Sequence, residues 1–194
     1  AALRAECSGF RVLLAEDNLV NQRLFVALLE KQGHAVTVVT DGRTAVDATL
    51  AGSFDVVVMD LQMPVMGGLE ATGLIRAAEA ATGRHVPIVA LTAHALAGDR
   101  ERCLDAGMDN FLSKPIHGPL LLAMLREVTG DVPAATPVVD PVPVTSSPID
   151  PRDVMARVDG DRALLAELAD IFQEQSRDLL AALKTAVSAG DATA

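Results

Sequence analysis

The chain has 194 residues, half of them apolar, and carries a formal net charge of −10 at pH 7. Its length suits one domain of ordinary size and part of a second. Because Lys and Arg form no cluster in this acidic sequence, we expect no nucleic-acid-binding surface. The richest apolar run, residues 120–125, is far shorter than the roughly 20 residues that span a bilayer, so we expect no membrane contact by this chain.

The cysteines and the first residues indicate a reduced compartment and a longer parent protein. Cys7 and Cys103 fit neither a metal-binding spacing nor a disulfide framework, which favours a cytoplasmic setting. Residues 1–9 lack the basic and apolar segments of a signal peptide, and we expect them to be a short N-terminal segment of a piece cut from a longer chain. An inner-membrane anchor of that parent protein would then lie outside this sequence.

Short apolar runs alternate with amphipathic segments between residues 10 and 129. We predict strands over residues 11–15, 35–39, 55–59, 88–91 and 111–113. The first helix is predicted over residues 21–32, with Gly33 ending it, and the last over residues 119–128. Five successive βα units predict a doubly wound, flavodoxin-like α/β fold, in which helices cover both faces of a five-stranded parallel sheet.

The sequence changes character after this (βα)5 domain. Residues 130–152 are rich in proline and show neither helical nor strand period, so we expect an extended linker. Residues 161–189 resume a helical apolar stripe, interrupted at Gln175 and Ser176. A single helix cannot bury such a stripe, so we expect residues 153–194 to be a helical fragment that is mobile or covers Leu168, Phe172, Leu179 and Leu183 against a neighbouring surface.

Polar residues follow four of the predicted strands, at the edge where ligands of open α/β sheets bind. They are Glu16, Asp17 and Asn18 after the first strand, Asp60 after the third, Thr92 and Ala93 after the fourth, and Lys114 and Pro115 after the fifth. Carboxylates brought together repel unless a divalent cation lies between them, and oxygen ligands alone suit Mg²⁺ rather than zinc. Asp60 is then placed to attack phosphorus and form an acyl phosphate, with Lys114 balancing the charge.

Four segments resemble the motifs of the response-regulator receiver family of bacterial two-component phosphorelays. They are Leu14-Ala15-Glu16-Asp17-Asn18, Val58-Met59-Asp60-Leu61-Gln62-Met63-Pro64-Val65-Met66-Gly67-Gly68, Leu91-Thr92-Ala93 and Phe111-Leu112-Ser113-Lys114-Pro115. The resemblance covers residues 10–129 and implies that Asp60 accepts a phosphoryl group. It implies direct Mg²⁺ ligation by Asp17 and Asp60, ligation through water by Glu16, and a further ligand from the Gln62 backbone carbonyl.

The resemblance also implies a conformational switch. Lys114 would pair with the phosphoryl group, and Thr92, beside Ala93, would swing its hydroxyl toward a phosphoryl oxygen. Phe111 would then turn inward and change the surface of the fourth helix and fifth strand, which is compatible with a core aromatic, because a switch residue packs in one of its states. Gln62 and His94 occupy positions that tune water access in the family, while plain solvent exposure is the alternative for His94. The family holds the bond before Pro115 cis, which the sequence alone cannot show.

The main functional hypothesis is a signalling module that takes a phosphoryl group from the phosphohistidine of a kinase dimerisation domain and relays it to a histidine phosphotransfer domain or changes its own surface. One rival is a phosphatase of the haloacid-dehalogenase type, which would need a general acid at Gln62 that an amide cannot supply. The other is an unphosphorylated receiver-like interaction domain, which would normally lack one of the acidic or lysine residues that this chain keeps.

The chain beyond residue 130 suggests the parent protein. No Gly-x-x-x-x-Gly-Lys loop is present, so any nucleotide chemistry belongs elsewhere in the system. A receiver followed by a Pro-rich linker looks like the C-terminal part of a hybrid sensor histidine kinase. Residues 154–161 and 164–168 resemble the opening of a histidine phosphotransfer domain. Since no histidine follows His117, we expect residues 153–194 to be an incomplete domain that cannot accept phosphate from Asp60.

Overall fold

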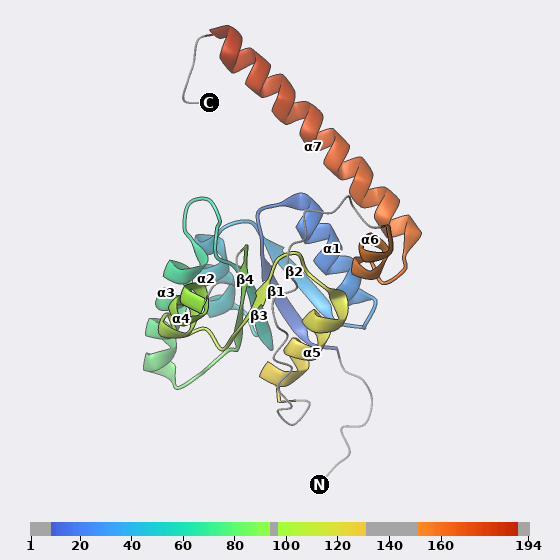
Figure 1. Ribbon diagram of the computed structural model, residues 1–194. Helices are drawn as coiled ribbons and strands as arrows, with labels where there is room; N and C mark the ends of the chain where they lie inside the picture. The colour runs from blue at the N-terminus through green and yellow to red at the C-terminus, as the bar shows by residue number, and fades with distance from the viewer. Residues whose placement is uncertain (1–8, 94–96, 131–150, 190–194) are drawn as a thin grey trace.

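The computed structural model describes residues 9–93, 97–130 and 151–189. Five strands form one parallel sheet in the order β2-β1-β3-β4-β5, which confirms the predicted flavodoxin-like α/β fold (Figure 1). The strands are β1 (Arg11–Ala15), β2 (Ala35–Val39), β3 (Val56–Asp60), β4 (Ile88–Thr92) and β5 (Asn110–Ser113). Every residue of β3 and β4 is buried, as expected for apolar strands covered on both faces.

Five helices cover the two faces of the sheet. They are α1 (Leu19–Glu30), α2 (Gly42–Ala51), α3 (Gly68–Thr82), α4 (Ala97–Asp105) and α5 (Gly118–Val128). Phe25 and Leu29 of α1 pack with Leu121 and Leu125 of α5 in one core, against one face of the sheet. The other core lies on the opposite face and joins side chains of α2, α3 and α4 (Figure 1). The two cores fix the strands, and with them the residues at the strand ends.

Several boundaries differ from the predicted ones by one or two residues. The first helix begins at Leu19 rather than at Asn21, because the Asn18 side chain accepts hydrogen bonds from the backbone N–H groups of Val20 and Asn21 and caps the helix. The third strand begins one residue late, at Val56, although the backbone N–H of Asp55 already donates to the Arg11 oxygen of β1 at 2.9 Å.

Two further helices follow, α6 (Pro151–Arg157) and α7 (Arg162–Ala189). Helix α6 begins inside the range predicted as linker, since proline is well accommodated in the first turn of a helix. Most of that predicted linker, residues 131–150, lies outside the described residues. Helix α7 is continuous through Gln175 and Ser176, the two polar residues that interrupt its apolar stripe in the sequence.

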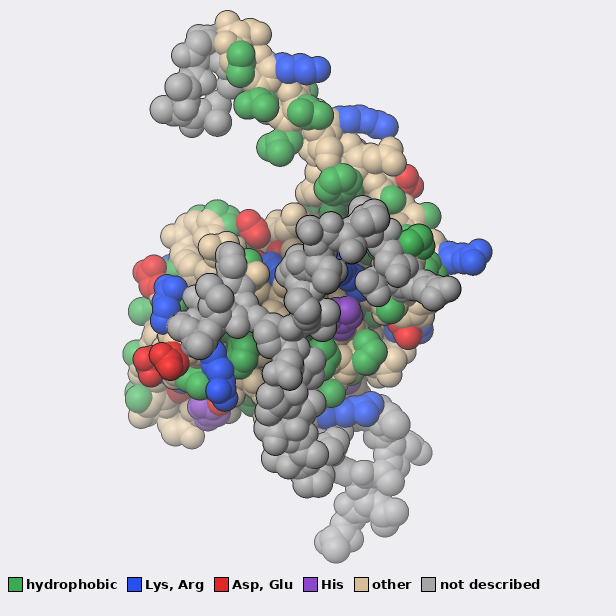
Figure 2. Space-filling view, viewed as in Figure 1, with side chains coloured by type: hydrophobic (Ala, Val, Ile, Leu, Met, Phe, Trp, Pro, Cys, Tyr) green, Lys and Arg blue, Asp and Glu red, His purple; other side chains and the backbone are tan. Residues whose placement is uncertain are grey.

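Helix α7 packs on the α/β domain with its first half only. Leu168 is buried, but Phe172, Leu179 and Leu183 are 62%, 75% and 55% exposed, so this structure does not cover three of the four side chains named in the covered alternative. The other alternative, a mobile helix, stays a prediction. Hydrophobic side chains line the projecting half of the helix in the space-filling view (Figure 2). Within the described ranges, none of the helices is long and apolar enough to span a membrane.

Candidate functional site

Three carboxylates meet at the carboxyl ends of β1 and β3. Glu16 and Asp17 follow β1 directly, and Asp60 is the last residue of β3. One oxygen of each side chain lies within 4.8 Å of the other two. Glu16 is fully buried and Asp60 is nearly so, whereas Asp17 is exposed, so the acidic cluster opens to solvent on the Asp17 side. The predicted convergence of these three residues is therefore observed.

Lys114 comes to the same cluster from the end of β5. Its Nζ atom donates hydrogen bonds to Glu16 Oε2 at 2.8 Å and to Asp60 Oδ2 at 2.5 Å. The ammonium group thus bridges the two buried carboxylates, which balances charges that would otherwise be costly to bury. The following Lys114-Pro115 peptide bond is cis, in agreement with the isomer that the family resemblance implies.

The pKa values of Glu16 and Lys114 reflect two opposing effects, burial and hydrogen bonding. Burial raises the pKa of Glu16, and the hydrogen bonds from Lys114 and Asn21 offset only part of this effect. For Lys114, burial disfavours the charged form, but the hydrogen bonds to Asp60 and Glu16 outweigh it and leave the pKa above its ordinary value. The lysine is therefore held as a cation beside Asp60.

Two residues of α1 that the sequence analysis did not single out hold Glu16 in place. The Asn21 side-chain amide donates to Glu16 Oε1 at 2.9 Å, and the Gln22 amide donates to the Glu16 backbone oxygen at 2.6 Å. The backbone N–H of Asn18 also donates to Oε1. The sequence did contain a signal for this role. Asn21 and Gln22 lie in the first turn of a helix that begins just after Glu16 and Asp17, where side chains face the ends of the strands.

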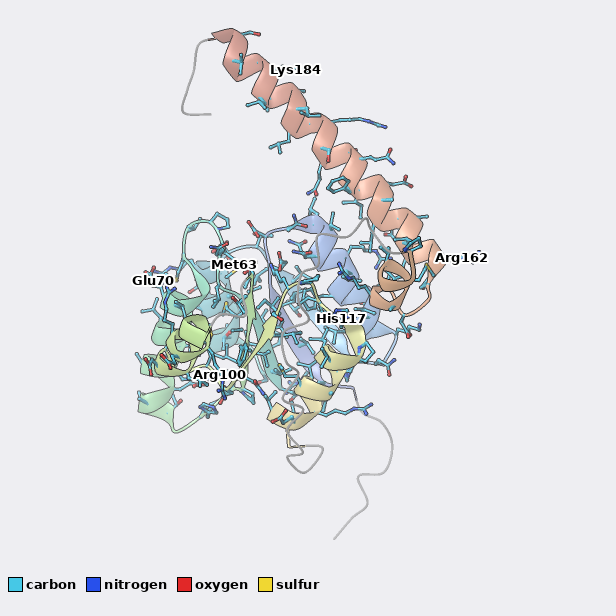
Figure 3. The ribbon with its side chains drawn as sticks, in the orientation of Figure 1. Met63, Glu70, Arg100, His117, Arg162 and Lys184 are labelled. Carbon is cyan, nitrogen blue, oxygen red and sulfur yellow. The ribbon has the colours of Figure 1, made fainter. Side chains whose placement is uncertain are left out.

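The loop after β3 packs tightly against the end of that strand. The backbone N–H of Gln62 donates to Asp60 Oδ1 at 3.1 Å, while the Gln62 side chain is exposed. A Cβ atom on Gly68 would lie 2.2 Å from the backbone oxygen of Asp60, so only glycine lets α3 start this close to the strand. Met63, labelled in Figure 3, belongs to the same loop.

The remaining predicted residues surround the cluster at the ends of β4 and β5. Thr92 is buried and Ala93 is exposed. Phe111 is half-buried, and the guanidinium of Arg100 on α4 lies 5.8 Å from the centre of its ring (Figure 3). Pro115 is exposed. His94 lies outside the described residues.

A five-stranded doubly wound sheet whose strand ends gather three carboxylates and one lysine is the arrangement of a phosphoacceptor signalling domain. The profile of the response regulator receiver domain matches residues 12–126, and the chain belongs to this family. A curated relative is the hybrid signal transduction histidine kinase I of Dictyostelium discoideum, which is 44% identical over 121 residues. These residues make up 60% of this chain and 7% of that kinase, so the chain corresponds to a small part of such a protein.

Two solved structures are similar over the same region. The receiver domain of sensor histidine kinase PA1611 from Pseudomonas aeruginosa, determined with a magnesium ion coordinated in its active-site cleft, is 47% identical, with a TM-score of 0.58 and coverage of 63% of this chain and 98% of that one. The receiver domain of Saccharomyces cerevisiae Ssk1, crystallised with the histidine phosphotransfer protein Ypd1, is 31% identical, with a TM-score of 0.60 and coverage of 63% and 90%. The chain is thus similar to receiver domains of phosphorelays.

Proposed function

We propose that Asp60 accepts a phosphoryl group from a phosphohistidine and that this transfer is the function of residues 10–129. The observation that carries the proposal is the position of Lys114 Nζ, 2.5 Å from Asp60 Oδ2, inside a cluster of three carboxylates. Such a site combines a carboxylate nucleophile with cations that can offset the charge of a transferring phosphoryl group.

The cluster fits a magnesium ion. Carboxylates alone, one of them exposed, suit a hard cation that keeps several of its waters. Asp17 and Asp60 would bind the ion directly, Glu16 would hold it through water, and the Gln62 carbonyl would supply a further ligand. When bound, the ion supplies positive charge to the phosphoryl oxygens and relieves the repulsion among the carboxylates. The magnesium in the related PA1611 receiver domain supports this choice of metal.

The chain's own residues then have separate tasks. An Asp60 oxygen attacks phosphorus, a P–O bond forms and the P–N bond to the donor imidazole breaks, with the electron pair returning to the donor nitrogen. Lys114 moves from the carboxylates to a phosphoryl oxygen, and the Thr92 hydroxyl, beside Ala93, binds another. Phe111 turns inward toward the space that Thr92 leaves, which changes the face formed by α4 and β5. The exposed Gln62 side chain, with His94, controls the approach of water.

The rival functions are less well supported by the same site. A phosphatase of the haloacid-dehalogenase type needs a general acid two residues after its nucleophile, where this chain has Gln62. A receiver-like domain that is never phosphorylated would have no need for the complete set of Glu16, Asp17, Asp60 and Lys114. The complete set favours phosphorylation with slow turnover.

The parent protein is a hybrid sensor histidine kinase, so ATP-dependent kinase activity belongs to another part of it and not to residues 10–129. The similarity to the Dictyostelium hybrid kinase supports this assignment. The donor is then the phosphohistidine of a kinase dimerisation domain, and the recipient is a histidine phosphotransfer domain, as suggested by the Ssk1 receiver crystallised with Ypd1. Residues 153–194 are the beginning of such a phosphotransfer domain, and this part of the protein lies in the cytoplasm.

Labelling with a small phosphodonor tests the function directly. With Mg²⁺ and acetyl phosphate, the chain should gain one phosphoryl group that is stable in acid and labile in base, as an acyl phosphate is, seen by intact mass. Asp60→Asn should gain none, and Asp47→Asn, which replaces an exposed aspartate on α2, should be labelled like the wild type. Equal labelling of Asp60→Asn would place the nucleophile elsewhere.

A further inference from the structure

The hairpin formed by α6 and α7, residues 151–189, is docked on the outer face of α1. Val158, Leu164 and Leu168 of the hairpin form a small buried cluster, against which Val20, Leu24 and Ala27 of α1 pack. These α1 residues recur at helical spacing on the side of α1 turned away from the sheet. The face of α1 therefore accepts an amphipathic helical partner, and the chain supplies one itself (Figure 1).

Two ion pairs fix the position of the hairpin on α1. Arg23 binds Glu167 through two hydrogen bonds, of 2.5 Å and 2.8 Å, and Lys31 binds Asp159 at 2.5 Å. The basic residues come from α1 and from Lys31 directly after it, and the acidic residues come from the hairpin. This surface of α1 is thus matched to an acidic helix, although partly exposed ion pairs of this kind add little stability each.

Beyond Leu168, α7 runs past the N-terminal end of α1, the helix that follows the acidic pair Glu16 and Asp17 in the chain. A groove of about 430 Å³ separates the two helices, lined by Leu19, Gln22 and Val26 on the α1 side and by Ile171, Glu174 and Asp178 on the other. Leu19 is two residues from Asp17, and Gln22 holds the backbone of Glu16. From there α7 projects away from the α/β domain toward Lys184 (Figure 3).

We propose that the α6–α7 hairpin competes, within the same chain, with any protein that delivers a phosphoryl group to Asp60. The proposal rests on the proposed function of Asp60. A protein donor must bring its phosphohistidine to the solvent-facing side of the cluster, next to Asp17 and Leu19, and there it meets α7 together with the charges of Glu174 and Asp178. A small donor such as acetyl phosphate reaches Asp60 without displacing the hairpin.

The size of the interface makes such competition workable. Three buried apolar side chains and two exposed ion pairs form a contact that a partner can displace. The same P–N bond breaks and the same P–O bond forms on Asp60 whether the hairpin is docked or released. Docking therefore changes only the fraction of chains open to a protein donor, and the apparent affinity for that donor falls in proportion to this fraction.

The first experiment establishes release in the full chain. Leu168→Asp places a charge in the buried cluster and should shift the NMR amide signals of Val20, Leu24 and Ala27. Phe172→Asp, at an exposed position on the same helix, should leave those signals in place. Glu167→Arg places two like charges against each other at Arg23 and should also release the hairpin, and combining it with Arg23→Glu should restore docking, because the charges are then again opposite.

The second experiment compares two donors, phosphorylated Ypd1 protein from yeast and acetyl phosphate. Leu168→Asp and Glu167→Arg should accept the phosphoryl group from Ypd1 at least about three-fold faster than the wild type, which corresponds to a hairpin docked in most molecules. Phe172→Asp and the reversed ion pair should match the wild type. With acetyl phosphate all variants should react alike.

The outcomes separate this proposal from the function on which it rests. Equal rates from Ypd1 for wild type and released variants, including no transfer to any of them, would overturn the competition, as would an equal acceleration with both donors. Failure of acetyl phosphate to label Asp60 in the wild type would instead overturn the proposed function.

Discussion

The side-chain amide of Asn21 holds one oxygen of Glu16 at 2.9 Å, while Lys114 holds the other oxygen at 2.8 Å. The buried carboxylate is therefore fixed from both sides, by a neutral donor from α1 and by a cation from the end of β5. This arrangement leaves the carboxylate little freedom to rotate, and it orients Glu16 toward Asp17 and Asp60.

Removing the neutral donor should weaken metal binding. Asn21→Ala is expected to lower Mg²⁺ affinity about ten-fold, because residues that orient a metal ligand through a hydrogen bond have effects of this order. Calorimetry is the suitable method, since the chain has no tryptophan. Gln32→Ala, which removes an exposed amide just beyond α1, is the matched control, and an Asn21→Ala affinity equal to that of this control would contradict the role.

Removing the cation should have the opposite effect on metal affinity. Lys114→Ala is expected to bind Mg²⁺ as tightly as the wild type or more tightly, because the lysine no longer repels the metal or occupies oxygens of Glu16 and Asp60. The NMR response to phosphorylation should weaken at the same time.

Asp17→Ala should have the reverse effect on metal binding and lower the Mg²⁺ affinity measured by calorimetry. An unchanged Mg²⁺ affinity in that variant would remove Asp17 from the site.

The loop between β3 and α3 carries local strain at Val65. This residue has a φ of 66°, which a β-branched side chain rarely adopts, and the N–H of Met66 donates to the Pro64 oxygen at 2.6 Å across it. Relief of such strain is worth roughly 1–3 kcal/mol. The greater freedom of glycine in the unfolded chain offsets about 0.5–1 kcal/mol of that gain.

Val65→Gly should therefore raise the free energy of unfolding by about 1 kcal/mol. Little burial is lost, because the Val65 side chain is 88% exposed. Urea unfolding without Mg²⁺ measures the change. Val65→Ala keeps the Cβ atom and should gain much less, so equal stability of the two variants, or a less stable glycine variant, would show that the loop is not strained.

The sequence was sufficient for the sheet and for the acidic cluster, because strand-end residues of parallel strands meet at one edge whatever the details of the helices. It was insufficient for Asn21 and Gln22, whose role depends on the exact rotation of α1 about its axis, which follows from how Phe25 and Leu29 pack in the core. It also could not place α7, since an apolar stripe indicates that a helix packs without indicating on what. Leu168 packs against α1, whereas Leu179, on the same stripe, is exposed.

His34 couples the stability of the domain to pH. Its Nδ1 atom accepts a hydrogen bond from the backbone N–H of Phe10 at 3.0 Å, and its ring stacks on Phe10 with the ring centres 5.1 Å apart. A protonated imidazole cannot accept this bond. Partial burial, and to a smaller extent the charge of Arg126, lower the pKa of His34 below its ordinary value.

Because the folded pKa lies below the unfolded one, the unfolded chain takes up the proton first as the pH falls. The contribution of His34 to stability is complete above the unfolded pKa, near 6.5, and is lost as the pH falls through the lower, folded pKa. Urea unfolding between pH 7.5 and pH 5 should show a loss in the wild type that is smaller in His34→Gln, whose amide oxygen can accept the Phe10 bond without titrating. Arg126→Gln should raise the folded-state pKa of His34 in an NMR titration and make the loss smaller, because the folded pKa then lies closer to the unfolded one. Identical pH profiles for the wild type and His34→Gln would mean that other groups account for the whole dependence.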